Sequence, residues 1–305
     1  MSLVPADMRL LLVHAHPDDE TIQNGATMAR YVAEGRQVTL VTCTAGELGE
    51  VLVPELAHIA ADRDDTLGEH RREELAAAMA ILGVTDHRFL GGFGAFRDSG
   101  MKWHEKGYAI AADETDDRAF ANADLTQAAD ELVKVIREVR PQVLVTYDEF
   151  GNYGHPDHIQ AHRVAMYAAQ LAAVPSYKRD LGEPHDIAKI YWCAMSEARM
   201  RESLRALRAS GDTETFAGMD PEGDMGPFTT PDAWLAAAID GGEFGEKKID
   251  AMKAHRTQID PDGPFFAMGG SVGTAFWSTE FYRLAKGEQG PVGADGFETD
   301  LFAGL

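Results

Sequence analysis

The sequence has few cysteines and no long hydrophobic run. Only two cysteines, Cys43 and Cys193, occur among 305 residues, each inside an apolar stretch. Two buried thiols are therefore expected rather than a disulfide, as is usual in a reducing compartment. No stretch reaches the roughly 18 apolar residues of a membrane span, and the first residues lack the pattern of a secretory signal. We expect a cytoplasmic protein that has no membrane element.

Basic residues are also scarce. The 28 lysines and arginines face 50 aspartates and glutamates, which gives a net charge of −22. Such a surface repels phosphate backbones and anionic lipid surfaces, so nucleic-acid and membrane partners are not expected. The apolar share of 45% and the charged share of 26% are ordinary for a globular protein, and they exclude wholesale disorder.

Short apolar runs alternate with helical patterns in the first two thirds of the chain. Strands are predicted at Arg9–Val13, Val38–Cys43, Arg88–Leu90, Val143–Tyr147 and Ile187–Met195. Helices are predicted at Thr21–Glu34, Leu67–Leu82, Leu125–Val139 and Ile159–Ala173, with a loop at Gly91–Asp116. This alternation predicts an α/β, Rossmann-like fold whose mostly parallel sheet carries helices on both faces.

The last third is less regular. Helices are predicted at Ser196–Ser210, Asp232–Ile239 and Lys247–Gln258, and loops at Gly211–Pro231, Pro261–Gly273 and Lys286–Glu298. We expect a catalytic core over residues 8–195 and a smaller C-terminal elaboration over residues 196–305 that packs on it. Because no clean linker separates them, a single domain is the preferred interpretation.

The first cluster of reactive residues, His14 to Glu20 (HAHPDDE), directly follows the strand Arg9–Val13. Ligands of open α/β sheets bind at the carboxyl ends of strands. His16 and Asp19, on either side of a turn stiffened by proline, can converge on one ion. An imidazole with a carboxylate suits Zn²⁺ or Fe²⁺, and Asp18 would remain beside the metal as a free base.

Two other interpretations of this first cluster stay open. Asp18 or Asp19 could simply cap the following helix while His14 packs in the core. A different alternative is an acidic Mg²⁺ pocket with a phosphate-accepting aspartate, although histidines suit that hard cation poorly.

The second cluster, Asp148 to His158 (DEFGNYGHPDH), follows the strand Val143–Tyr147 in the same way. His155 and His158 lie three residues apart with a proline between them, and His162, four residues beyond His158, could share the helix face of His158. One of these histidines can complete a site with three protein ligands and an open position, which is the pattern of catalytic zinc. Taken alone, the same residues could be helix capping and surface decoration.

The two motifs together resemble the LmbE/PIG-L family of metal-dependent N-acetylglucosaminyl deacetylases. The resemblance rests on His16–Asp19 (HPDD) and His155–His158 (HPDH), with their flanking strands, and extends to a later stretch at Lys248–Gln258. Further similarity lies with the branch that deacetylates an N-acetylglucosaminyl-inositol in mycothiol biosynthesis. Gln23–Gly25 (QNG) stands where the related S-conjugate amidases usually carry a Lys-Gly pair.

The resemblance implies one metal ion per subunit, Zn²⁺ or alternatively Fe²⁺, held by His16, Asp19 and His158. A metal-bound water would be the nucleophile, with Asp18 as general base. The remaining implied roles are those of the second loop. A protonated His155 would be general acid and oxyanion partner, Asp157 would orient His155 and favour its charged form, and Tyr153 would bond the oxyanion or act as a gate.

The resemblance also implies a small amino-sugar substrate and residues that bind it. Arg71 and Asp98 would hold sugar hydroxyls, with Glu50 and Met101 lining the pocket, although Arg71 also fits a solvated helix face. An oligomer is compatible with the sequence. Three alternatives remain for the function: an amidase for mycothiol S-conjugates, a deacetylase of another N-acetylglucosamine derivative, or a metal-binding protein without turnover.

Overall fold

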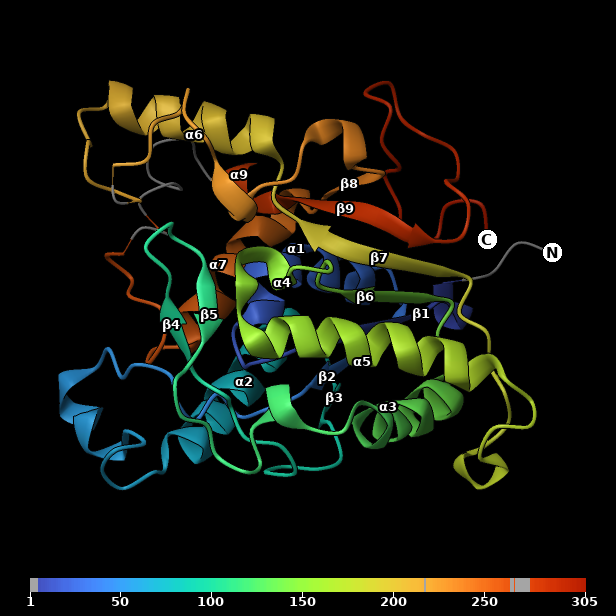
Figure 1. The fold of residues 1–305 in the computed structure, drawn as a ribbon. Coiled ribbons are helices and arrows are strands. Elements are labelled where there is room, and N and C mark those ends of the chain that lie inside the picture. The colour runs from blue at the N-terminus through green and yellow to red at the C-terminus, as the bar shows by residue number, and fades with distance from the viewer. Residues whose placement is uncertain (1–4, 217, 264–265, 267–274) are drawn as a thin grey trace.

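A seven-stranded sheet runs through the fold of the computed structural model, which describes residues 5–216, 218–263, 266 and 275–305 (Figure 1). Its strand order is β3-β2-β1-β6-β7-β9-β8. The strands are β1 Arg9–His14, β2 Gln37–Thr42, β3 Asp86–Phe89, β6 Val143–Thr146, β7 Lys189–Ala194, β8 Ala237–Asp240 and β9 Thr279–Lys286. The neighbouring strands β3, β2, β1, β6 and β7 pair in parallel, whereas β9 is antiparallel to both β7 and β8. The predicted mostly parallel α/β sheet is confirmed.

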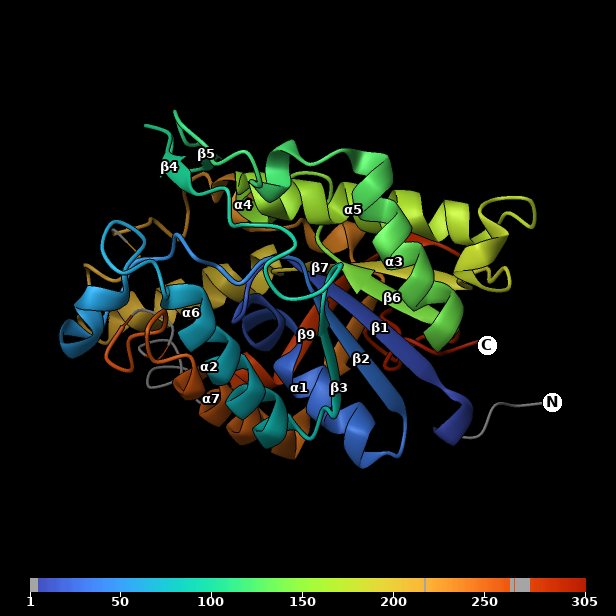
Figure 2. The ribbon, with the colours of Figure 1, turned by 90° about the horizontal axis from the view of Figure 1, so that it is seen from below.

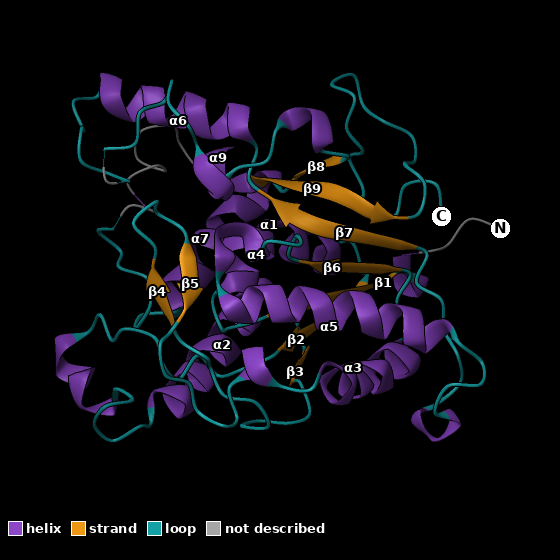
Figure 3. Cartoon of the chain, viewed as in Figure 1, coloured by secondary structure: helices purple, strands orange, loops and turns teal. Residues whose placement is uncertain are grey.

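Helices cover both faces of this sheet (Figures 2 and 3). They are α1 Asp19–Ala33, α2 Leu67–Leu82, α3 Leu125–Val139, α4 Gly151–Gly154, α5 Pro156–Ala173, α6 Glu197–Ala209, α7 Gly245–Ala254 and α9 Ala275–Ser278. Figure 2 shows α3 and α5 on one face and α1, α2 and α7 on the other. The helix α5 begins three residues before the predicted start because His155 Nδ1 caps it by accepting the Asp157 N–H at 3.1 Å.

The strands β1 and β6 place the site. Leu10 to Val13 of β1 and Val143 to Val145 of β6 are fully buried, because both faces of the parallel sheet are covered. These two strands are neighbours, and the chain continues outward from them in opposite directions, to β2 and β3 on one side and to β7 on the other. Such a switch point opens a crevice at the carboxyl ends of the strands, and the loops that carry the two His-Pro-Asp motifs leave the sheet there.

The C-terminal third contributes to the same sheet through β8 and β9. Outside the sheet, α6 packs into a small second apolar cluster with Met225, Phe276 and Trp277. The predicted helix at Asp232–Ile239 is wrong: a short 3₁₀ turn at Asp232–Trp234 is followed by β8. Pairing of Ala237 to Asp240 with β9 outweighs the helix propensity of the alanines.

Two loop predictions also need comment. The predicted loop Gly91–Asp116 contains an antiparallel hairpin, formed by β4 Met101–Trp103 and β5 Ala109–Ala111. Three-residue strands are too short to show a sequence period, so the hairpin was not foreseeable from alternation. The predicted loop Pro261–Gly273 lies mostly outside the described residues.

The two cysteines are buried and free, as expected, and burial raises the pKa of both thiols. Among the described residues, no helix is both long and apolar enough to cross a membrane.

A buried ion pair fastens α7 to β9 and yields the first prediction. Lys248 Nζ lies 2.7 Å from Glu280 Oε1, and both side chains are 3% exposed. The Glu280 carboxylate also accepts the N–H groups of Ala26 and Thr27. Lys248→Ala is expected to lower the free energy of unfolding in urea by about 3–5 kcal/mol, because it leaves a buried carboxylate without its cation. The matched control is Lys247→Ala, one residue earlier and exposed, which should change stability by under about 0.5 kcal/mol.

Candidate metal centre and active site

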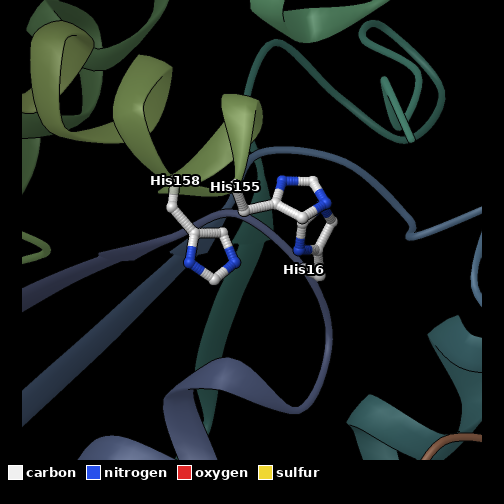
Figure 4. A group of neighbouring side chains, drawn as sticks. All are labelled: His16, His155 and His158. Atoms are coloured by element: carbon white, nitrogen blue, oxygen red, sulfur yellow. The ribbon is translucent and has the colours of Figure 1, made fainter. Parts of the chain in front are cut away.

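Histidines from the two loops converge at the carboxyl ends of β1 and β6. His16 lies in the turn between β1 and α1, whereas His155 and His158 lie at the start of α5 (Figure 4). Nitrogen atoms of the three rings lie within 4.8 Å of one another, and all three residues are buried. A second group of the same kind joins His16 and His155 with Asp98 and Asp157.

Asp19, the first residue of α1, lies between two of these rings. Its Oδ2 atom is 3.3 Å from His16 Nδ1 and 3.3 Å from His158 Nε2. The same oxygen accepts hydrogen bonds from the His16 N–H at 3.0 Å and from the Tyr147 hydroxyl at 2.7 Å. Burial opposes ionisation, yet His158 and His16 hold the pKa of Asp19 well below its ordinary value.

His158 tests whether a metal fits these residues. Its side chain is fully buried, and its Nδ1–H donates to the Gly151 carbonyl at 3.2 Å. This bond leaves the lone pair of a neutral ring on Nε2. Although Asp19 lies 3.3 Å away, Nε2 forms no hydrogen bond with the described residues. A buried acceptor without a donor, facing a carboxylate, is the arrangement that a metal ion satisfies.

His16 shows the same preference for a cation. Its Nε2 lies 3.2 Å from Asp157 Oδ2 and 3.6 Å from Asp98 Oδ1, while Nδ1 faces Asp19. Burial lowers the pKa of His16, but the three carboxylates outweigh it and raise this pKa well above the ordinary value. The pocket therefore favours positive charge at the His16 ring. The carboxylates and imidazoles gathered around this ring form a donor set that fits a divalent metal ion.

Asp18 lies beside the cluster and is held by Arg71. The Arg71 Nη2 atom donates to Asp18 Oδ2 at 3.1 Å and to the Pro17 carbonyl, and Nη1 donates to the Gly46 carbonyl at 2.7 Å. Arg71 is only 3% exposed, so the solvated-face interpretation is excluded. Burial raises the pKa of Asp18 to about 6, against the opposing charge of Arg71.

The contacts of Asp157 and His155 differ from expectation. The Asp157 carboxylate faces His16 and accepts both the N–H and the hydroxyl of Ser99, and no described contact joins it to the His155 ring. Instead the Asp157 backbone N–H donates to His155 Nδ1. Burial, with His16 and His158 nearby, lowers the pKa of His155 well below its ordinary value. A neutral His155 ring therefore carries its proton on Nε2.

Tyr153 lies in an aromatic stack at the edge of the site. Its ring centroid is 5.0 Å from that of His158, 5.8 Å from Trp103 and 6.1 Å from Phe228. Gly154, at φ 95°, lets the β4–β5 hairpin approach closely, because a Cβ atom there would lie 2.5 Å from the Ala109 carbonyl oxygen. The stack thus joins the loop that carries Tyr153 and His155 to the β4–β5 hairpin.

The predicted substrate residues divide into two pairs. Arg71 and Asp98 are buried within the cluster, and the Asp98 carboxylate accepts the N–H groups of Leu48 and Gly100. Glu50 is exposed, and Met101 is half-buried at the start of the hairpin. No described contact places Glu50 or Met101 against the histidines.

Sequence reasoning gave no role to two residues that support the site. Tyr147 bonds Asp19 and accepts the Ala15 N–H at 2.8 Å, and Ser99 binds Asp157. The only signal for either was position: Tyr147 ends a predicted strand, and Ser99 follows Asp98. His14 lies behind the cluster, where its Nε2–H donates to Asn24 at 2.7 Å, and His162 binds the Tyr147 carbonyl at 3.0 Å.

The chain is similar in sequence to one protein family and to proteins of known name. The sequence model of one family, described as GlcNAc-PI de-N-acetylase (PIG-L), matches residues 11–169. A protein of Nocardioides sp. named 1D-myo-inositol 2-acetamido-2-deoxy-α-D-glucopyranoside deacetylase is 70% identical over 299 residues, which cover 98% of this chain and 99% of that protein.

Solved structures share the fold at low identity. N,N′-diacetylchitobiose deacetylase from Pyrococcus horikoshii matches with a TM-score of 0.59 and 17% identity, over 90% of this chain and 83% of that one. GalB, the 4-carboxy-2-hydroxymuconate hydratase of Pseudomonas putida, matches with a TM-score of 0.60 and 17% identity, over 94% and 100%. Because one is a deacetylase and the other a hydratase, this fold alone does not decide the reaction.

Proposed function

The chain belongs to the GlcNAc-PI de-N-acetylase (PIG-L) family, and from that membership we propose that it hydrolyses the N-acetyl amide of 1D-myo-inositol 2-acetamido-2-deoxy-α-D-glucopyranoside. The products would be acetate and glucosaminyl-inositol with a free amine. This reaction would be a step of mycothiol biosynthesis. The chain is an enzyme, an N-deacetylase that hydrolyses an amide bond. The observation that carries the substrate is the 70% identity with a deacetylase of that name along almost the whole of both chains.

The proposed cofactor is one Zn²⁺ per subunit, with Fe²⁺ as the alternative, held by His16, Asp19 and His158. The unpartnered Nε2 of His158 and the three carboxylates around the His16 ring support this assignment. When bound, the ion would polarise the acetyl carbonyl and lower the pKa of a water molecule.

Asp18 is proposed as the general base. It lies next to the ligand Asp19 but faces Arg71, so its carboxylate can take a proton from the attacking water. A base acts only when ionised, and the Arg71 guanidinium favours the ionised carboxylate against the cost of burial.

His155 is proposed as the donor to the amide. Because Nδ1 accepts the Asp157 N–H, the Nε2–H of the neutral ring is the donor available to the developing oxyanion. As general acid toward the leaving amine, the ring would act in its protonated form and return to neutral imidazole when the proton leaves. Tyr153 is proposed as a second donor to the oxyanion or as a gate. The proposed part of Asp157 is to orient His155 through its backbone while its carboxylate holds His16.

Substrate hydroxyls are proposed to bind Arg71 and Asp98, with Glu50 and Met101 lining the pocket. One observation supports Arg71 in this role: its buried Nε–H has no hydrogen-bond partner among the described residues, although the two Nη atoms are occupied. A sugar hydroxyl would satisfy that donor.

The setting of the reaction is proposed as well. The name of the 70% identical relative supports a small amino sugar as substrate, and the two free, buried thiols support a cytoplasmic location.

Amine release from N-acetylglucosaminyl-inositol tests the function. Chelator-stripped protein should release no free amine, and one equivalent of Zn²⁺, or of Fe²⁺ without oxygen, should restore release. Full metal uptake with no amine released would keep the metal site and refute the substrate. A higher kcat/KM on mycothiol S-conjugates would then indicate the amidase alternative.

A further inference from the structure

One residue of the late segment Lys248–Gln258 reaches the loop that carries Asp18. His255 follows the end of α7, is fully buried, and donates from Nε2 to Glu20 Oε1 at 3.2 Å. Glu20 is the second residue of α1 and is also fully buried. A buried hydrogen bond between residues 235 positions apart joins the C-terminal third to the first catalytic motif.

The Glu20 carboxylate uses its two oxygens differently. Oε1 accepts from His255 and from the Thr21 hydroxyl at 2.6 Å, whereas Oε2 accepts the backbone N–H of Asp18 at 3.0 Å. The hydrogen bonds from His255 and Thr21 therefore orient the Glu20 carboxylate, and the oriented carboxylate restrains the Asp18 peptide through its N–H.

The Asp18 backbone needs such support. It lies at φ 109° and ψ −37°, a backbone conformation that residues other than glycine rarely adopt. Residues in sparsely populated regions cost about 1–3 kcal/mol and persist only where the surroundings hold them. On one side Arg71 holds the Asp18 carboxylate and the Pro17 carbonyl, and on the other side Glu20 holds the Asp18 N–H.

We propose that Glu20, fixed by His255, is a positioning residue that holds Asp18 in its strained conformation, with its carboxylate directed at the reacting water. The inference rests on the proposed function, in which Asp18 is the base. In the contacts described, the Glu20 carboxylate bonds none of the side chains of the proposed metal ligands.

A simpler role for Glu20 is its charge at the start of α1, where a carboxylate stabilises the helix dipole. Two conservative variants separate the roles. Glu20→Gln loses the charge but keeps the length and an oxygen that can accept the Asp18 N–H. Glu20→Asp keeps the charge but is one methylene too short to span from Asp18 to His255. If Glu20 positions Asp18, the kcat of Glu20→Gln should exceed that of Glu20→Asp. If Glu20 acts only through its charge at the helix start, the kcat of Glu20→Asp should be the higher of the two.

A double-mutant cycle with Asp18 tests the inference through activity. Glu20→Ala should lower kcat 10- to 100-fold, with KM within threefold and one equivalent of metal retained. In an Asp18→Ala background, Glu20→Ala should cost less than twofold, because a group that acts through Asp18 has nothing left to position. An equal cost in both backgrounds, or loss of metal in Glu20→Ala, would overturn the proposal.

Amide exchange reads the same contact without substrate. The Asp18 N–H should be protected from hydrogen exchange in the metal-loaded wild type and should exchange at least tenfold faster in Glu20→Ala. Equal exchange in the two proteins would refute the positioning role. Because this measurement needs no turnover, an inactive wild type would refute the proposed function and leave this result to decide the inference.

A matched control is Glu298→Ala, which removes another fully buried carboxylate, bound by Lys189 at 2.6 Å and by Tyr191 at 2.6 Å. Lys189 is the first residue of β7 and so lies at the amino ends of the parallel strands, opposite the carboxyl ends that carry the site. This variant should lower the melting temperature without changing the exchange of the Asp18 N–H.

Discussion

His158→Ala is expected to lose the bound metal and with it all measurable amine release. The substitution removes the buried Nε2 that has no hydrogen bond with the described residues. It also leaves Asp19 without one of the two rings that hold its pKa low. Metal content after dialysis, measured by elemental analysis, should fall from one equivalent to near zero. Activity should fall by more than about 10⁴-fold, because a bound ion would supply both activation of the water and charge stabilisation.

Two neighbouring histidines sharpen this prediction. His162→Ala, one turn further along α5, should keep its metal, because the His162 ring binds the Tyr147 carbonyl. His155→Ala should also keep its metal, whereas Asp19→Ala should lose it. The structure contains a second close group built on His16, His155, Asp98 and Asp157. Loss of metal in His155→Ala with retention in Asp19→Ala would move the metal site to that group.

Asp18→Ala is expected to keep one equivalent of metal and lose activity by roughly 10²–10⁴-fold, the usual contribution of an acid–base residue. Burial raises the pKa of Asp18 to about 6, and a bound cation lowers it again. A base must be ionised to act, so kcat/KM of the wild type should fall as the pH drops through this pKa, at or below about pH 6.

Asp18→Asn provides the control for this second prediction. This variant keeps the side-chain volume and an oxygen for Arg71 but cannot accept a proton, so it should be as inactive as the alanine variant. The fall of kcat/KM at or below about pH 6, the acidic limb of the pH profile, should also be absent. Activity near the wild-type level in either variant would remove Asp18 from the mechanism. A limb that persists in Asp18→Asn would belong to another group.

The strands nearest the two motifs, and the contact between His16 and Asp19, were predictable because local sequence specifies them. The runs at Arg9–Val13 and Val143–Tyr147 are buried on both faces, which leaves a continuous apolar signal. A histidine three residues from a carboxylate across a proline turn has little freedom to point elsewhere. His16 and Asp19 therefore lie 3.3 Å apart, as their spacing suggested.

The rest depends on partners that are distant in the sequence. Ala237 to Asp240 has no strand pattern of its own and becomes β8 only by pairing with β9. Asp157 lies two residues from His155, but its carboxylate faces His16, 141 positions earlier. Glu20 looks like an ordinary acidic residue at a helix start until His255 is placed beside it. Spacing along the chain cannot rank such alternatives, because each depends on how separate elements pack.

The position of β9 in the sheet has a consequence for synthesis on the ribosome. The proposed ligands are all present once residue 158 has been made, but β9, which covers the outer edge of β7, follows only after residue 278. At about 5–20 residues per second, a nascent chain spends roughly 6 to 24 seconds in that interval. For part of that time, after its synthesis, β7 is an open edge able to pair with another chain. Early metal capture would then order the N-terminal half while its sheet is still unfinished.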